Sequence, residues 1–200
     1  MKYKTILGDP PWEYGQWGKA NPISRPHGKS YPMPYPSMSI QEIMRLPVRQ
    51  IADENCELYL WTTQKYLPPA FDVIKRWGFK YCQTLTWCKA PRGLGQEGLY
   101  CPTTEFLLLS RIGKMPKCRR LDSTWFAIKR PHNSHSTKPE FFQDMIEQVS
   151  LPPRLELFAR RKRQSWYVWG NEVECDIDLL AMQQADERTQ EGGMNDRQHL

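Results

Sequence analysis

The sequence Asp9-Pro10-Pro11-Trp12 follows a short apolar run over residues 3–7. Proline has no N–H to donate and fixes its own φ, so a strand over that run cannot continue through this motif. Pro11 also holds Pro10 in the extended region, which fixes the direction of the backbone carbonyls. The motif therefore predicts a strand end at which a carboxylate, two oriented carbonyls and an aromatic ring lie together. The alternative is a plain proline turn with Trp12 buried in the core.

Segments with strand and helix periods alternate along the rest of the chain. Strands are predicted over residues 58–62, 79–89, 104–110, 155–159 and 166–169, and helices over residues 40–46, 64–77 and 139–150. Ser39 with Glu42 forms a capping box for the first helix, and Gly78 ends the second. This alternation predicts an α/β fold, with a mostly parallel sheet and helices on both faces. Ligands bind such sheets at the carboxyl ends of strands, where Asp9 lies.

Two segments show neither period. Residues 14–38 interleave aromatic and basic side chains, which favours a loop that faces the substrate over a plain linker. Residues 91–98 are rich in glycine but lack the spacing and flanking elements of a dinucleotide fingerprint. We therefore interpret the second segment as a mobile loop and not as a phosphate cradle.

Length and composition limit the class of protein. Two hundred residues suffice for one α/β domain, expected over residues 1–175, followed by an acidic polar tail over residues 176–200. No apolar run has the length of a membrane span, and no signal peptide precedes the first strand, so we expect a cytoplasmic protein, or a nuclear one if the cell has a nucleus. Six cysteines without Cys-x-x-Cys spacing predict buried, reduced thiols and no metal site.

The net charge of +6 is unevenly distributed. Residues 172–200 carry eight acids and two basic residues, whereas residues 1–171 carry 26 basic and 14 acidic residues. Between Arg111 and Lys138, eight basic residues accompany one acid, Asp122. A basic body of this kind favours a polyanionic substrate, and phosphate contact is the role predicted for the basic segment. The alternative is a solvated basic face.

Three separated motifs, taken together, resemble a known family. They are Asp9-Pro10-Pro11-Trp12, His135-Ser136-Thr137-Lys138-Pro139, and Leu155-Glu156-Leu157-Phe158-Ala159-Arg160 followed by Trp166 and Gly170-Asn171-Glu172. Their order and spacing are similar to those of the MT-A70 family of S-adenosylmethionine-dependent adenine N6-methyltransferases, over about residues 3 to 173. The resemblance implies a Rossmann-like methyltransferase sheet in permuted order, with the catalytic strand first and the cofactor strand last. It also implies a nucleic-acid substrate, and the short chain resembles compact bacterial and phage members, which favours DNA over RNA.

The resemblance also implies roles for single residues. Lys138, at a predicted helix N-terminus, is expected to bind the methionine carboxylate of S-adenosylmethionine, an anion that both the lysine and the helix dipole favour. The full set of cofactor contacts is Asp9, Lys138, Glu156, Phe158, Arg160, Asn171 and Glu172. One departure concerns the segment after Arg160, where some family members have His-Asn and this chain has Lys162-Arg163. Structural alternatives are a surface lysine for Lys138 and an ion pair with Glu156 or Glu172 for Arg160.

The catalytic residues are expected to be Asp9, Pro10, Pro11 and Trp12. Asp9 and the carbonyl of Pro10 would each accept one N–H of the adenine amine and so localise the nitrogen lone pair. Trp12 and Tyr35 would stack on the base once it leaves its helix. Together with the basic segment, the predicted substrate contacts are Trp12, Tyr35, Glu105, Arg119, Arg120, Lys129, Arg130 and His135.

Two other functions stay open from the sequence. One is a catalytically silent nucleic-acid-binding subunit of the same fold, which pairs with an active one. The other is an amino methyltransferase that acts on cytosine N4 or on a protein amide, since an X-Pro-Pro-aromatic motif serves several amine acceptors. Family members often pair, so a homodimer or a heterodimer is expected.

Overall fold

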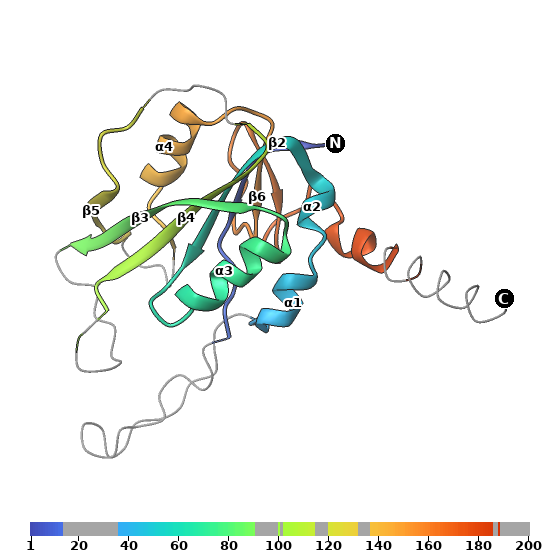
Figure 1. The fold of residues 1–200 in the computed structure, drawn as a ribbon, viewed down its shortest axis with the longest axis horizontal. Helices are drawn as coiled ribbons and strands as arrows, with labels where there is room; N and C mark the ends of the chain where they lie inside the picture. Colours follow the sequence, from blue (N-terminus) through green and yellow to red (C-terminus); the bar gives the residue numbers. More distant parts are fainter. Residues whose placement is uncertain are drawn as a thin grey trace, which may run out of the picture.

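The computed structural model describes residues 1–13, 36–90, 100, 102–114, 120–131, 137–185 and 188. Within these ranges the chain forms the seven strands and four helices labelled in sequence order below, and residues 179–185 are helical as well (Figure 1). The elements are β1 (Tyr3–Gly8), α1 (Ile40–Arg45), α2 (Val48–Ile51), β2 (Ala52–Thr62), α3 (Leu67–Arg76), β3 (Lys80–Ala90), β4 (Thr104–Ile112), β5 (Trp125–Lys129), α4 (Phe141–Val149), β6 (Arg154–Leu157) and β7 (Trp166–Trp169). Most of the predicted loop over residues 14–38 and all of residues 91–98 lie outside the described residues.

The seven strands form one sheet in the order β5-β3-β4-β2-β1-β6-β7. Only β4 runs antiparallel to its two neighbours, β2 and β3, and the other four pairings are parallel. The carboxyl ends of six strands and the amino end of β4 therefore meet along one edge, which we name the carboxyl edge. The predicted α/β class and the mostly parallel sheet are confirmed, and the motif at residues 9–12 lies at the middle of this edge.

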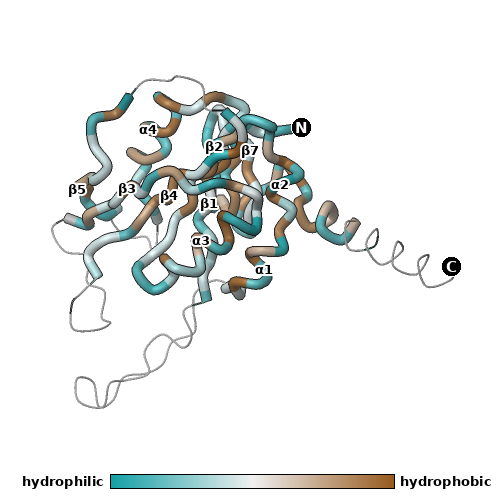
Figure 2. Tube along the Cα trace, in the orientation of Figure 1, coloured by the Kyte–Doolittle hydropathy of each residue, from teal (hydrophilic) through white to brown (hydrophobic). Residues whose placement is uncertain are grey.

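Helices cover both faces of the sheet, as the alternating pattern predicted. Side chains of successive strand residues point to opposite faces. One core packs Ile6, Leu58 and Leu60 against α1 and α3, and a second core packs Leu7 and Tyr59 against α4. In Figure 2 the apolar residues run through the central strands, as expected for a sheet that is buried on both sides.

The structure differs from the predicted elements in several places: helix α2 was not predicted, and β6 ends at Leu157 and not at residue 159. Three further differences have clear causes. Strand β5 was not predicted, because its short sequence lies within the basic segment and only Phe126 and Ile128 pack inward. Helix α3 begins at Leu67 and not at residue 64, since Pro68 and Pro69 fit only the first helical turn. Strand β2 begins at Ala52, before its buried part, because its first residues are polar.

The packed core extends past the predicted boundary at residue 175. Leu179 is fully buried and Met182 packs against the same core as α1 and α3. The prediction of buried thiols is wrong for two cysteines, because Cys82 and Cys175 are exposed, whereas Cys56 is buried. In the described part of the chain, no helix is long and apolar enough to cross a membrane.

A tight backbone contact joins the ends of β6 and β7. Phe158, directly after β6, has a φ of 63°, which turns the chain away from the strand. The N–H of Ala159 then donates to the carbonyl of Trp169 at 2.9 Å. At Gly170 an added Cβ would lie 2.1 Å from the Ala159 oxygen, so only glycine fits there. The turn over residues 158–160 is thus fixed against the end of β7.

We expect Gly170→Ala to lower the free energy of unfolding by about 2 to 3 kcal/mol, because the methyl group collides with backbone that cannot move aside. The matched change Gly8→Ala should cost much less, since its Cβ would meet the Leu60 Cδ1 at an ordinary 3.4 Å. Urea denaturation of both variants measures the difference. Equal stabilities would show that the 158–160 turn shifts freely.

Candidate active site at the carboxyl edge

The motif at residues 9–12 is held by its own backbone. The N–H of Trp12 donates to the Pro10 carbonyl at 2.8 Å, and the N–H of Met38 donates to the Pro11 carbonyl at 2.8 Å. A carbonyl oxygen has two lone pairs, so Pro10 keeps one acceptor position in a fixed direction. Asp9, directly after β1, is half-buried. The Asp9 carboxyl group and a carbonyl with one acceptor position left are therefore adjacent in the chain, with Pro10 itself buried.

Four charged side chains of alternating sign form a row along this edge. The Lys138 Nζ lies 2.8 and 2.7 Å from the two carboxylate oxygens of Asp9. It also lies 3.4 Å from the Glu105 Oε2, and the other oxygen of Glu105 lies 2.6 Å from the Lys89 Nζ. We name Lys89, Glu105, Lys138 and Asp9 the charge row. Its members come from the end of β3, the start of β4, the segment before α4 and the end of β1.

Burial and mutual attraction act against each other in the charge row. Burial raises the pKa of Asp9, and the Lys138 ammonium opposes this shift. Burial alone would lower the pKa of Lys138, but the carboxylates of Asp9 and Glu105 outweigh it and raise that pKa. Burial also disfavours the ionised form of Glu105, yet Lys138 and Lys89 together lower its pKa. Two carboxyl groups and two amino groups therefore alternate along the row, and each contacts a neighbour of the opposite type.

Two tryptophans lie beneath the lysines of the charge row. The Lys138 Nζ is 5.5 Å from the centre of the Trp61 ring, and the Lys89 Nζ is 5.6 Å from that of Trp87. Ring faces attract cations at these distances. Both rings are buried, so each lysine ammonium packs against an aromatic ring that is held in place by the core.

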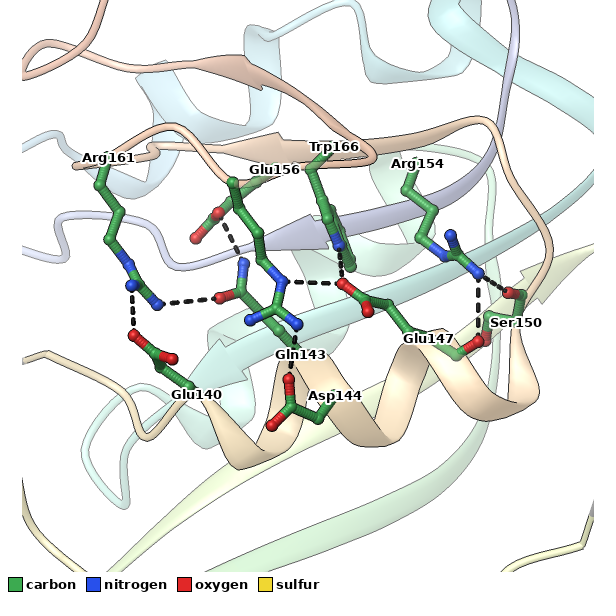
Figure 3. Close-up of polar contacts among 10 residues, drawn as sticks. Glu140, Gln143, Asp144, Glu147, Ser150, Arg154, Glu156, Arg161 and Trp166 are labelled. Atoms are coloured by element: carbon green, nitrogen blue, oxygen red, sulfur yellow. Dashed lines mark hydrogen bonds and ion pairs between the residues drawn. The ribbon is translucent and has the colours of Figure 1, made fainter.

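A further carboxylate, Glu156 on β6, lies next to Asp9 at the carboxyl edge. Burial raises the pKa of Glu156 to about 7, a hydrogen bond from Gln143 opposes the shift, and the charge of Asp9 adds to it. The amide Nε2 of Gln143 donates to the Glu156 Oε2 at 2.8 Å (Figure 3). The Gln143 Oε1 accepts from Arg161 at 3.5 Å, so the amide can present only its NH₂ group to Glu156.

The two residues that depart from the family pattern are held by other side chains. Arg163 donates to Glu147 at 2.7 Å and to Asp144 at 2.5 Å, both on α4. Lys162 lies 3.1 Å from Glu174 and 3.9 Å from Asp176. These ion pairs fasten the segment after Arg160 to α4 and to the chain beyond β7. A ribose contact from either side chain would require breaking them.

The remaining predicted cofactor residues gather at the ends of β6 and β7. Phe158 packs edge-on against Trp169, with ring centres 5.4 Å apart. The Arg160 Nε lies 3.6 Å from the Glu172 Oε1, so the ion pair named as the structural alternative is present. Asn171 and Glu172 are exposed in the turn after β7. The structure brings this group to the same edge as the charge row.

Trp12 does not have the surroundings predicted for it. Its ring is 3% exposed, stacks on Tyr66 with ring centres 5.2 Å apart, and donates its indole N–H to the Trp61 carbonyl at 3.2 Å. A ring so covered offers no free face to a base. The alternative reading of a buried Trp12 is correct in this respect, and the ring supports the motif from within the core.

The basic segment does not form a single cluster. Because β4 runs antiparallel, Arg111 and Lys114 near its end lie at the edge opposite Asp9. Lys129 and Arg130, at the end of β5, lie at the carboxyl edge and are exposed, and Arg120 is exposed before β5. Glu105 and Lys138 belong to the charge row and not to a phosphate-binding surface. The predicted substrate contacts Tyr35, Arg119 and His135 lie outside the described residues.

Sequence reasoning missed Lys89 and Gln143. Lys89 is the last residue of the predicted strand 79–89, and its place at a carboxyl strand end could have indicated the site. Gln143 is buried on α4 between the apolar positions Phe142 and Met145. A polar residue on the inward face of an amphipathic helix needs a buried partner, which was the available signal.

The sequence is similar to those of known proteins over a range that includes every strand of the sheet. The MT-A70 family model matches residues 3–172. The type II methyltransferase M.MunI of Mycoplasma sp is 30% identical over 184 residues, which cover 86% of this chain and 78% of that protein. The N(6)-adenine-specific methyltransferase METTL4 of Mus musculus is 24% identical over 188 residues, or 86% of this chain and 37% of that protein.

A third relative, the N(6)-adenosine-methyltransferase MT-A70-like protein of Drosophila melanogaster, is 25% identical over 183 residues. The match covers 86% of this chain and 27% of that protein, so the chain corresponds to only part of the animal relatives. The matched residues 3–172 contain β1 to β7, the charge row and Glu156. The chain therefore belongs to the MT-A70 family.

Proposed function

We propose that this MT-A70 methyltransferase uses S-adenosylmethionine to methylate the N6 amine of adenine in nucleic acid, and in DNA rather than RNA. The observation that carries the proposal is the Asp9 carboxylate beside the fixed Pro10 carbonyl, with the Lys138 ammonium between two acids. The relatives named as adenine or adenosine N6-methyltransferases support the choice of acceptor. Residues 1–175, with Leu179 and Met182 packed onto them, would form the catalytic domain, and the chain beyond would be an acidic tail.

The charges at the carboxyl edge fit the proposed cofactor. S-adenosylmethionine carries one carboxylate and two cationic groups, and it supplies a methyl group that is already activated. Lys138 is the cation placed to hold the carboxylate. Glu156 and Asp9 are the anions that face the cationic part. Phe158, Arg160, Asn171 and Glu172 would contact the nucleoside part, where an amide and a carboxylate suit hydroxyl and amine groups.

Asp9 and Pro10 would act on the acceptor amine. The lone pair of the adenine amine is delocalised into the ring, so the nitrogen is a poor nucleophile. The Asp9 carboxylate accepts one N–H and the free lone pair of the Pro10 carbonyl accepts the other, which draws the lone pair onto nitrogen. As the nitrogen gains positive charge its proton becomes acidic, and an Asp9 oxygen can hold it. No base with a tuned pKa is needed before attack.

Lys138 would have two successive partners in this scheme. Without a ligand, Lys138 forms an ion pair with Asp9, a half-buried carboxylate that would be destabilising without a partner. A carboxylate bound to Lys138 would share that charge, and Asp9 would then accept the amine. Lys138 thus has an anionic partner both with and without the ligand, and neither state leaves its charge unpaired.

The first test gives the purified chain isotopically labelled S-adenosylmethionine with DNA and RNA of matched sequence, each single- and double-stranded. We expect N6-methyladenine in DNA after digestion to nucleosides and mass spectrometry. Asp9→Ala should give no product while it still binds the cofactor in calorimetry, because Lys138 and Glu156 remain.

Product on cytosine, or on RNA alone, would overturn the proposed acceptor. Methylation that persists in Asp9→Ala would remove Asp9 from the mechanism. If the wild-type chain binds no cofactor, it is the silent subunit that the sequence left open.

Lys138→Ala should weaken cofactor binding about 10- to 100-fold, since a hydrogen bond to a charged group contributes about 1.5 to 3 kcal/mol. Lys138→Arg, which keeps the charge, should lose less. Lys75→Ala, an exposed lysine on α3, serves as the control. Calorimetry on the three variants measures the effect. A normal affinity in Lys138→Ala would leave Lys138 only the structural role of neutralising Asp9.

Glu156 should make cofactor binding depend on pH. Its pKa of about 7 is set by burial, and the charge of Asp9 raises it further, whereas Gln143, Arg161 and Arg163 lower it. Its ionised form attracts the cationic part of the cofactor, so affinity should rise up to about 10-fold per pH unit below about pH 7 and level off above it. The folding stability of the ligand-free chain should show the opposite trend. The folded state binds the Glu156 proton more tightly than the unfolded state does, so the contribution of Glu156 to stability falls as pH rises through about 7.

Titration calorimetry between about pH 6 and pH 8 checks this dependence. Glu156→Gln should flatten the curve. A wild-type affinity that does not change with pH, or the same slope in Glu156→Gln, would place the titrating group elsewhere.

A further inference from the structure

The edge strand β5 presents two different faces. Phe126 points inward, with its ring centre 5.4 Å from that of Phe141 and 5.7 Å from that of Phe142 on α4. The alternate residues Trp125, Ala127 and Lys129 are exposed on the opposite side of the sheet. We name these three residues the β5 face. In Figure 1 the strand lies at the far left end of the sheet.

Trp125 is the unusual member of the β5 face, because 63% of its surface is exposed. Its neighbours on β3 are Thr86, opposite Trp125, and Cys88, opposite Ala127, both partly exposed. Helix α3, on the same side, packs on β2 and on the start of β3, where Phe71 contacts Tyr81. A ring of this size gains substantial free energy when it is covered, so a ligand that stacks on it would be stabilised.

The charges around the β5 face indicate an anionic partner. Arg120, Lys129 and Arg130 are exposed, and among the described residues none of the three forms an ion pair. Asp122 is the single acid within the described residues 120–131. An exposed aromatic ring beside several cations suits single-stranded nucleic acid, since a base stacks on the ring and phosphates contact the cations.

Strand order relates the β5 face to Asp9. Lys129 and Asp9 both lie at the carboxyl edge, and β5 lies four strands from β1. Strands are about 4.8 Å apart, so the two residues lie at least about 19 Å apart, measured across the strands. A stacked nucleic-acid strand that rises about 3.4 Å per nucleotide covers this distance in five to six nucleotides, and an extended strand in fewer. One strand can therefore reach both places.

We propose that the β5 face binds an unpaired stretch of nucleic acid that flanks the target adenine. Trp125 stacks on a base of this flank, and Lys129 with Arg130 contacts its phosphates. This inference rests on the proposed function, because it adds a second contact to the same substrate. It assigns Trp125 a role that neither the sequence motifs nor the family match indicated.

A second copy of the chain is the other occupant to consider. A twofold interface pairs the same patch on both subunits. Two β5 faces would then bring the six cations of the two copies, Arg120, Lys129 and Arg130 of each, into one interface, and like charges brought together oppose association. The charges therefore favour nucleic acid over self-association.

The test compares oligonucleotides in which the target adenine has two flanking nucleotides on each side with others extended to eight nucleotides on one side. For the wild type, extension on one side should strengthen binding about 10-fold, as expected from one stacked base and its phosphates. Trp125→Ala should lose most of this gain and Trp125→Phe only part of it, while both methylate the short oligonucleotide at the wild-type rate. Lys129→Gln should reduce the salt dependence of binding to the extended strand by about one phosphate contact.

Tyr167→Ala is the matched control, an exposed aromatic residue on β7 at the other end of the sheet, and it should keep the full gain. An equal gain in Trp125→Ala and wild type would overturn the proposal. So would a loss of self-association in Trp125→Ala, measured by sedimentation, without any loss of binding to the extended strand. If the wild type methylates neither oligonucleotide, the proposed function fails first, and that outcome is distinct because it does not depend on Trp125.

Discussion

The ion pair between Lys138 and Asp9 is the interaction on which the carboxyl edge depends. An isolated carboxylate at this depth would lose its charge or destabilise the fold, and an isolated ammonium would do the same. Each of the two groups is therefore maintained by the other, and Glu105 and Lys89 extend the compensation to four charges. A row of alternating acids and amines can exchange a partner with a charged ligand while the other contacts in the row remain. That property suits the binding of the cofactor proposed above.

The order of strands explains how these charges meet although they are far apart in the sequence. Asp9 follows the central strand β1, and Lys138 comes 129 residues later, before α4. Helix α4 covers one face of the sheet and places Gln143 against Glu156, whereas Arg163 fastens the next segment to the same helix (Figure 3). The helix thus has two tasks: it closes an apolar core through Phe142 and Ile146, and it fixes the polar side of the site.

Much of the fold could be predicted, because in most segments the hydrophobic periodicity agrees with the capping and turn residues at the segment ends. The capping box at Ser39 and Glu42 and the strand β7 are where the sequence indicated, and β6 overlaps its predicted strand but ends two residues earlier. The edge strand β5 was missed, because a strand with one face in water has few apolar residues and its pairing with β3 is a long-range property. Trp12 was assigned to the substrate because the motif indicates chemistry, while burial depends on Tyr66, which no local pattern connects to it. The ion pairing of Lys89 with Glu105 was likewise hidden, since only the register of β3 and β4 brings them together.

That register has a consequence for how such enzymes can diverge. Trp87 on β3 lies opposite Glu105 on β4, so Lys89, two residues further on, reaches Glu105 diagonally across the hairpin. The ladder between the two strands fixes this contact. Insertions or deletions between residues 91 and 99 would therefore leave Lys89 and Glu105 in register. The length of that link can change during evolution while the ion pair between the two strands is kept.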